Sequence, residues 1–343
     1  MPKGFFPVVP GLLLLLALPA HMALERPLRP ASAPDGARRI VSLAPGITET
    51  LYALKLGPRI VGVTRYCLYP PEAALKPRVA GFSDVNLEAV LRVRPDLVLL
   101  PEDKRDNLLR LETLGLPALP LDVSSPSALA ASVERIGKIT GRKAEAEALR
   151  AEFRSGLEAA AARAAGKTPP RVLFSVMRDI RGGGLSEVIA VGGDGFYSEL
   201  ITLAGGDNVC AGHVAFPRIS REALIFFDPE VIIDALPGGD AEQARRDWES
   251  LSSVSAVKTG RVFLLTDPAD TIPGPRFIRT LDKLSRAFHG DDREAVPRAD
   301  AFNRTDARKG QSVRGAVTRA DLSVSFRAKS GRGLTESRAS VIR

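Results

Sequence analysis

Short apolar runs alternate with amphipathic stretches along most of the chain. "RRIVSLA" and "RIVGV" are apolar runs of strand length, and "GITETLYALKLG" between them has helical spacing, with Gly57 as its expected C-cap. "NLEAVLRVR" predicts a short helix capped by Asn86, and "PDLVLL" predicts a buried strand after it. Apolar strands separated by helices are typical of a parallel sheet covered by helices. We therefore expect an N-terminal α/β lobe over residues 38–125.

The pattern changes between residues 126 and 168, where no strand-like run occurs. This interlobe segment is dense in Ala, Glu, Arg and Leu, which are strong helix formers. A helix over residues 143–165 would span roughly 34 Å at ~1.5 Å per residue. "TPP" at residues 168–170 is expected to end it, because proline cannot continue a helix.

Strand and helix patterns alternate again over residues 169–290. "RVLFSVM", "PEVIIDAL" and "RVFLLT" read as strands, and "PRFIRTLDKLSRAFHG" reads as a closing helix. The expected fold class is therefore α/β, with two Rossmann-like α/β lobes bridged by one long helix. A cleft between two such lobes is a common place for a small ligand.

The same spacing of residue types occurs twice, once in each expected lobe. "GFSDVNLEAVLRVRPDLVLL" begins at Gly81 and "AFPRISREALIFFDPEVIID" begins at Ala215. In each, a phenylalanine (Phe82, Phe216) is followed six residues later by a glutamate (Glu88, Glu222), and the two copies lie 134 positions apart. We interpret this as a duplication of architecture with weak sequence identity.

The two ends of the chain differ from the part between them. Residues 1–23 combine an early lysine, a leucine run and small residues, which is typical of a secretory signal, and a Pro/Ala linker follows over residues 24–37. The first cysteine after the leucine run is Cys67, so we expect no lipoprotein cysteine. The pattern predicts export to the periplasm, and an uncleaved membrane anchor is the alternative.

Charge is concentrated at the C-terminal end. Residues 291–343 carry 12 Lys and Arg against 7 Asp and Glu, so +5 of the whole-chain net charge of +8 lies in this stretch. Its lack of apolar periodicity predicts a disordered basic tail, since little apolar area is available to offset ordering entropy. The net charge therefore gives no reason to expect nucleic-acid binding by the folded part.

No familiar catalytic constellation is present, and we expect no enzyme. The sequence lacks a G-x-S-x-G elbow, an H-E-x-x-H pair and a P-loop. "VGGDGFYSEL" places glycines before a helix, but Ser198 stands where a dinucleotide fingerprint would have its third glycine. A tight turn is the simpler reading of this loop.

We expect no metal site, but three residues are the candidates if one exists. Cys67, Cys210 and His213 include a Cys-x-x-His spacing, and soft ligands of this kind bind transition metals. The alternatives are a disulfide between the two cysteines, or buried thiols and a loop histidine. An enzyme with a metal at these residues remains open at this point.

Other candidates have both a structural and a functional reading. Tyr66, Phe82 and Phe216 are either core aromatics or ligand contacts on loops. Glu88 and Glu222 each lie two residues after an expected N-cap, where an acid stabilises the helix dipole. Alternatively the two glutamates are exposed carboxylates, one on each lobe, that dock on a basic partner.

Several stretches together resemble a known family. "SLAPGITET", "YPPEA", "NLEAVL…PDLV", "SELITLAGGDNV" and "PRISREALIFFDPEVII" are similar to segments of the helical-backbone periplasmic binding proteins, the class III ABC solute-binding proteins. Within this family the chain most resembles the vitamin B12-binding proteins of ABC importers. The resemblance covers about residues 38–288 and implies two lobes, a bridging helix and a ligand cleft that closes little.

The resemblance also implies roles for individual residues. Ligand contacts fall on Tyr66, Phe82, Phe216 and Asp267, with Arg276 as a substitute for an expected arginine. The glutamates that pair with permease arginines fall on Glu88 and Glu222.

The sequence therefore predicts a monomeric solute-binding protein of an ABC importer that captures cobalamin or a related corrinoid and delivers it to the permease. The alternatives are a ferric-siderophore or haem binding protein of the same fold, a metal-binding Cys/His receptor, and a sensory receptor that serves no permease.

Overall fold

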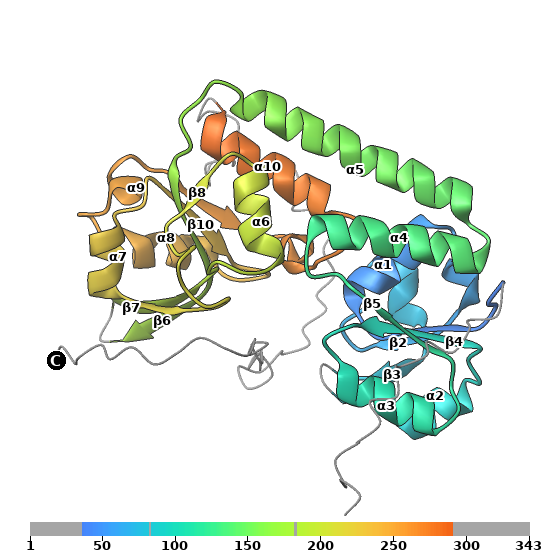
Figure 1. The fold of residues 1–343 in the computed structure, drawn as a ribbon. Coiled ribbons are helices and arrows are strands. Elements are labelled where there is room, and N and C mark those ends of the chain that lie inside the picture. The colour runs from blue at the N-terminus through green and yellow to red at the C-terminus, as the bar shows by residue number, and fades with distance from the viewer. Residues whose placement is uncertain (1–35, 82–83, 182–183, 291–343) are drawn as a thin grey trace, which may run out of the picture.

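The computed structural model describes residues 36–81, 84–181 and 184–290. These residues form two α/β lobes with a long helix running across the top of both (Figure 1). The expected signal over residues 1–23, the linker apart from its last two residues, Phe82 and the expected tail over residues 291–343 lie outside the described residues.

The N-terminal lobe contains a five-stranded parallel sheet in the order β3-β2-β1-β4-β5. Its strands are β1 (Ile40–Ser42), β2 (Ile60–Thr64), β3 (Arg78–Ala80), β4 (Leu97–Pro101) and β5 (Ala118–Leu121). The helices that connect them are α1 (Pro45–Ala53), α2 (Leu87–Arg92) and α3 (Arg105–Thr113). The apolar stretch at β4 is buried at its first four positions, as expected for a strand covered on both faces.

The expected end of α1 was wrong by several residues. The helix stops at Ala53, and Gly57 instead begins a 3₁₀ turn, η1 (Gly57–Arg59). A second 3₁₀ turn, η2 (Pro71–Leu75), lies between β2 and β3. The expected N-cap of α2 is confirmed, because the Asn86 side chain accepts a hydrogen bond from the backbone N–H of Ala89 at 2.9 Å.

The C-terminal lobe has a mixed sheet, whereas the sequence predicted a parallel one. The order is β11-β10-β6-β7-β9, and β8 pairs with the start of β6. Its strands are β6 (Arg171–Arg181), β7 (Gly184–Ala190), β8 (Asp207–Asn208), β9 (Arg218–Ser220), β10 (Val231–Ala235) and β11 (Val262–Leu265). β6 is parallel to β8 and β10, and β10 is parallel to β11, but β7 is antiparallel to both β6 and β9. The long hairpin of β6 and β7 was missed, because strongly polar residues follow the apolar start of β6.

Helices cover this sheet and close the chain. They are α6 (Phe196–Leu203), α7 (Arg221–Phe227), α8 (Ala241–Glu249), α9 (Ser255–Lys258), η3 (Pro268–Thr271) and α10 (Phe277–His289). The glycines before α6 allow a close backbone approach, because a Cβ on Gly192 would lie 1.7 Å from the carbonyl oxygen of Val214. This loop therefore turns the chain against a neighbouring segment, as the simpler reading of "VGGDG" expected.

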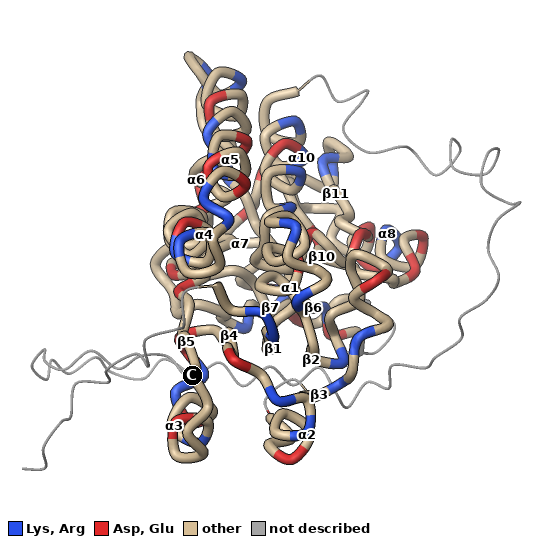
Figure 2. Tube along the Cα trace, turned by 90° about the vertical axis from the view of Figure 1, so that its right-hand side faces the viewer, with Lys and Arg blue, Asp and Glu red and all other residues tan. Residues whose placement is uncertain are grey.

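Two helices connect the lobes: α4 (Pro126–Thr140) and α5 (Lys143–Ala164). α5 ends one residue before the predicted position, and Gly166 in the left-handed region follows it, so the helix stops ahead of Thr168. α5 packs against α4 at one end and against α10 at the other (Figure 1). Basic and acidic residues are interspersed along α5 (Figure 2), and some of them are paired, such as Arg154 with Glu147 at 2.8 Å.

One apolar core continues through both lobes. It includes Leu97 of β4, Phe174 of β6, Phe153 of α5 and Phe277 of α10. The rings of Phe153 and Phe277 meet edge to face with centroids 4.9 Å apart. The two lobes are therefore joined by packing as well as by the chain. Among the described residues, no helix is long and apolar enough to cross a membrane.

Candidate functional site

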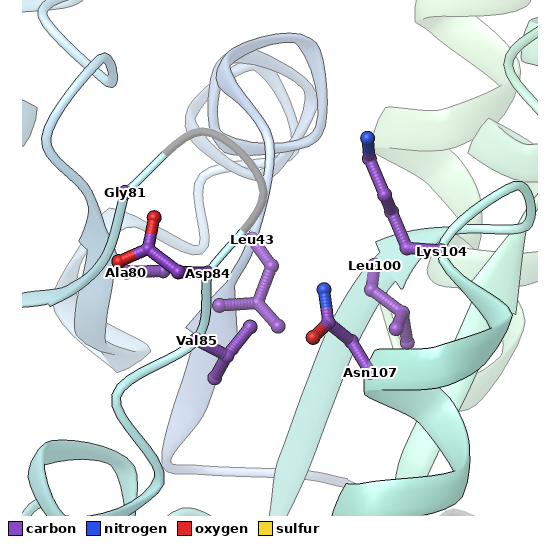
Figure 3. A pocket seen from close by; sticks show the side chains of 8 residues that line it. All are labelled: Leu43, Ala80, Gly81, Asp84, Val85, Leu100, Lys104 and Asn107. Carbon is purple, nitrogen blue, oxygen red and sulfur yellow. The ribbon is translucent and has the colours of Figure 1, made fainter. Parts of the chain in front are cut away.

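A pocket opens at the carboxyl edge of the N-terminal sheet (Figure 3). It is lined by Leu43, Ala80, Gly81, Asp84, Val85, Leu100, Lys104 and Asn107. Leu43 directly follows β1 and Leu100 lies in β4, and these neighbouring strands are where the strand order reverses. Ligands of open α/β sheets bind outside the carboxyl ends of the strands at such a switch point.

The pocket has an apolar floor between two charged walls. Leu43, Val85 and Leu100 form the floor, with Asp84 on one side and Lys104 on the other (Figure 3). The enclosed part of the hollow is about 10 Å³, room for roughly one water molecule, and so is far smaller than the ~300–1,000 Å³ of typical ligand pockets. A large ligand bound here would therefore extend beyond the pocket onto other surfaces.

Among the described residues, the predicted aromatic contacts do not line this pocket. Tyr66 follows β2, is half-buried, and has the Arg65 guanidinium 5.4 Å from its ring centroid. Phe216 lies just before β9, where it is half-buried against the core shared by both lobes. Phe82 is outside the described residues, although its neighbours Gly81 and Asp84 line the pocket.

Asp267 and Arg276 lie near each other, but both have structural partners. Asp267 is exposed and caps η3 by accepting a hydrogen bond from the backbone N–H of Ala269 at 2.8 Å. Arg276 donates from Nε and Nη2 to Glu49 at 2.8 and 2.5 Å. The hydrogen bond to Glu49 raises the pKa of Arg276 most strongly, and the charge of Asp267 raises it further. The main contact of Arg276 is therefore a residue of the other lobe.

Glu49 was not identified from the sequence. It lies in α1 with its side chain 3% exposed, and the Arg276 side chain is 15% exposed. The guanidinium of Arg276 also lies over the ring of Tyr69, 3.9 Å from the centroid. An acid in the apolar stretch "GITETLYAL" was the available signal, because a buried carboxylate requires a partner.

Two backbone segments touch beside this ion pair. A Cβ on Gly46 would lie 1.9 Å from the carbonyl oxygen of Pro273 and 3.1 Å from the Cα of Gly274. Only a glycine allows α1 to approach the other lobe this closely. The ion pair and the backbone contact together fix the junction between the lobes.

The two glutamates expected to dock on a permease are exposed on separate lobes. Glu88 in α2 forms an ion pair with Arg92 at 2.7 Å. Glu222 in α7 has its pKa lowered by its own backbone N–H and by the hydroxyl of Ser220. Both helices have the capped first turn that the sequence predicted, so the helix-dipole reading and the docking reading are compatible.

The three candidate metal ligands do not form one site. Cys67 and Cys210 are free thiols buried in different core clusters, and Cys67 contacts the hydroxyls of Thr48 and Thr64 at 3.1 and 3.2 Å. His213 is exposed, with its ring against Phe227. Among the described residues, no group of three or more His, Cys, Asp or Glu side chains is arranged to hold a metal ion.

The chain belongs to the periplasmic binding protein family, whose model matches residues 40–269. It is 29% identical over 262 residues to the uncharacterized ABC transporter substrate-binding lipoprotein YvrC of Bacillus subtilis, covering 74% of this chain and 81% of the relative. It is also 29% identical over 243 residues to a vitamin B12-binding protein of Yersinia pseudotuberculosis, covering 68% of this chain and 78% of the relative.

Solved structures show the same fold. The periplasmic vitamin B12 binding protein BtuF of Vibrio cholerae matches with a TM-score of 0.63 at 26% identity, over 73% of this chain and 96% of that one. A periplasmic heme binding protein from Pseudomonas aeruginosa matches with a TM-score of 0.64 at 26% identity, over 74% and 93%. These relatives are solute-binding proteins and not enzymes, and the family indicates an extracytoplasmic location.

Proposed function

We propose that this protein captures cobalamin or a related corrinoid outside the cytoplasm and delivers it to an ABC permease. The observation that carries the proposal is the pocket at the switch point of the N-terminal sheet. The hollow is too small for a macrocycle, so a peripheral group of the corrinoid enters it and the ring lies against the residues predicted as contacts, Tyr66, Phe82, Phe216 and Asp267. The vitamin B12-binding relative supports the choice of ligand.

The proposal assigns a role to each predicted contact residue. Tyr66, Phe82 and Phe216 pack on the ligand, and exposed Asp267 accepts hydrogen bonds from its periphery. Arg276 donates to Glu49 from its Nε and Nη2 atoms, so it has a structural role in addition to the ligand contact expected from the sequence. It bridges the lobes and supports Tyr69, whose ring is partly exposed.

Haem is the second candidate ligand. The observation that favours it is the match to a heme binding protein at the same 26% identity as the match to BtuF. Ferric siderophores are a third class carried by the same fold. All three are metal chelates that present a large surface to a cleft, so the same aromatic residues serve each of them.

A panel of ligands tests the assignment. Cobalamin, cobinamide, haem and ferric siderophores are titrated by calorimetry and by thermal unfolding. A ligand at 100 times its dissociation constant stabilises the fold by about 2.7 kcal/mol, which raises the melting temperature by roughly 5–10 °C. We expect this shift with a corrinoid. A shift with haem alone selects the second candidate, and no shift with any of them overturns the assignment of the pocket.

The remaining parts of the proposal concern export and delivery. The N-terminal residues direct export to the periplasm, and the protein acts as a monomer. Glu88 on one lobe and Glu222 on the other dock on basic residues of the permease, so that the ligand is presented to the transport path.

A further inference from the structure

The two helices proposed to dock on the permease are built alike. α2 and α7 each begin with a side-chain cap, in which Asn86 and Ser220 accept from the backbone N–H three residues later, at 2.9 and 3.3 Å. The acid is the second helical residue in each case, Glu88 in α2 and Glu222 in α7. The two helices can therefore be compared position by position.

An exposed apolar residue follows each acid by three positions. Leu91 is 44% exposed and Ile225 is 43% exposed. Residues three apart lie on the same face of a helix, so each helix presents a carboxylate beside an aliphatic side chain. At these two positions the surfaces of the two lobes have the same chemistry.

The next position differs between the helices. In α2 it is Arg92, whose Nη2 lies 2.7 Å from the Glu88 carboxylate, so Glu88 is already ion-paired within its own helix. In α7 it is Phe226, which is 83% exposed and has its ring centroid 6.0 Å from that of Phe227. Figure 2 shows opposite charges next to each other on α2.

The neighbouring arginine in α7 does not compensate for this difference. The Arg221 guanidinium donates to the backbone carbonyl oxygens of Ser250 and Leu185, at 2.6 and 3.2 Å, so its donors are directed into the lobe. Glu222 therefore combines an exposed negative charge with an exposed aromatic ring one turn away. Exposed aromatic side chains, phenylalanine included, are enriched at protein interfaces, and a charge beside one selects a partner of opposite charge.

We propose that residues 92 and 226 make the docking surface asymmetric, with the C-terminal lobe as the main anchor. Glu222, Ile225 and Phe226 bind a basic side chain beside an apolar depression on one permease subunit. Glu88, Leu91 and Arg92 bind the other subunit more weakly, because Glu88 must exchange Arg92 for the permease cation and Arg92 repels that cation. This inference rests on the proposed delivery to a permease.

Exchanging the two residues tests the asymmetry. Phe226→Arg gives Glu222 an intrahelical cation and removes the ring, whereas Arg92→Phe releases Glu88 and adds a ring. Leu75→Arg is the matched control, since Leu75 is 85% exposed in η2. Binding of each purified variant to the permease in lipid nanodiscs is measured by surface plasmon resonance, and self-association by sedimentation velocity.

We expect Phe226→Arg to weaken binding about tenfold or more, as for other interface anchors. Arg92→Phe should bind as tightly as the native chain or more tightly, and Leu75→Arg should match the native chain. Unchanged binding of Phe226→Arg, or equal losses for the two exchanges, overturns the proposal. A native dimer that Phe226→Arg dissociates, with permease binding intact, identifies a second copy as the occupant instead.

The double reversal Glu88→Lys with Glu222→Lys separates this inference from the function on which it rests. If the native chain does not bind the permease, or the double reversal binds equally well, the docking proposal itself fails. If the double reversal abolishes binding but Phe226→Arg does not weaken it, docking stands and only the asymmetry is wrong.

Discussion

Glu49 and Arg276 form a buried two-point ion pair between the lobes, although they lie 227 positions apart in the sequence. Glu49 belongs to α1 of the N-terminal lobe, and Arg276 precedes α10. Planar guanidinium and carboxylate groups match in this geometry, which fixes orientation as well as distance. The pair therefore sets how the two lobes face each other at the junction.

Removing one partner of this pair should be costly. Glu49→Gln leaves the Arg276 charge buried without a counter-ion, and we expect a loss of about 3–5 kcal/mol in the free energy of unfolding. Equilibrium denaturation in urea measures it. Glu88→Gln is the control, because its ion pair with Arg92 is exposed and should contribute about 0–1 kcal/mol. Equal losses in the two variants would show that the Glu49–Arg276 pair stabilises the fold no more than an exposed ion pair does.

The backbone contact beside the pair gives a steric prediction. Gly46→Ala places a methyl group where the Pro273 carbonyl lies, so the lobes must shift apart, at a cost of about 1–3 kcal/mol. Thermal unfolding gives the loss, and small-angle scattering reports the shift. Gly212→Ala should leave both unchanged, because a Cβ there has nothing within 4 Å. A Gly46→Ala protein with native stability would contradict the contact.

Ligand affinity should depend on Tyr66. We expect Tyr66→Ala to weaken binding of the ligand found in the panel by about tenfold, since an aromatic wall contributes on the order of 1 kcal/mol beyond the area it buries. Calorimetry measures the dissociation constant, and circular dichroism confirms that the variant is folded. Tyr197→Phe is a suitable control, because Tyr197 packs against Phe174 in the core. Native affinity in Tyr66→Ala would remove Tyr66 from the site.

Both thiols should be unreactive in the folded protein. Cys67 and Cys210 are buried, and burial raises the pKa of Cys210 to about 11, so little thiolate forms at pH 8. Iodoacetamide at pH 8 should leave both residues unmodified in mass spectra of the native protein and should alkylate both in guanidinium chloride. A mass two units lower before reduction would reveal a disulfide and contradict the two free thiols.

Transport should depend on the docking acids without any change in capture. Glu222→Lys should reduce ligand uptake by the reconstituted importer at least tenfold, because it presents a like charge to the permease cation. Its affinity for the free ligand should equal that of the native chain in calorimetry. Glu230→Lys, another exposed acid of the same lobe, serves as the control. Uptake at the native rate would show that Glu222 does not dock on the permease and serves only to stabilise the helix dipole of α7.

The two-lobed architecture could be predicted because it depends on local patterns. β4 and β10 are continuous apolar runs, and α5 is made of strong helix formers, so each element could be recognised from its own residues. The N-cap and first-turn acid that α2 and α7 share could likewise be recognised from neighbouring residues. All of these expectations agree with the structure to within a few residues.

The missed features depend on contacts between distant segments. The partner of Arg276 is fixed only when α1 meets the segment before α10, and nothing near Arg276 in the sequence indicates Glu49. The antiparallel β7 was missed for a related reason. Glu187 of β7 forms an ion pair with Arg218 of β9, and Arg178 of β6 pairs with two buried aspartates of the same lobe. Polar strand residues are therefore stabilised by neighbours that the apolar pattern does not reveal.

The packing of α5 also sets an order of events in folding. Gly156 of α5 lies so close to Ile278 of α10 that a Cβ there would be 2.5 Å from the isoleucine Cγ2, and Arg163 donates to Ser285 at 2.9 Å. These partners lie more than a hundred residues after α5 in the chain. The half of α5 that contacts α10 is therefore completed only when the last described helix packs against it, so the two lobes cannot finish folding one after the other as independent units.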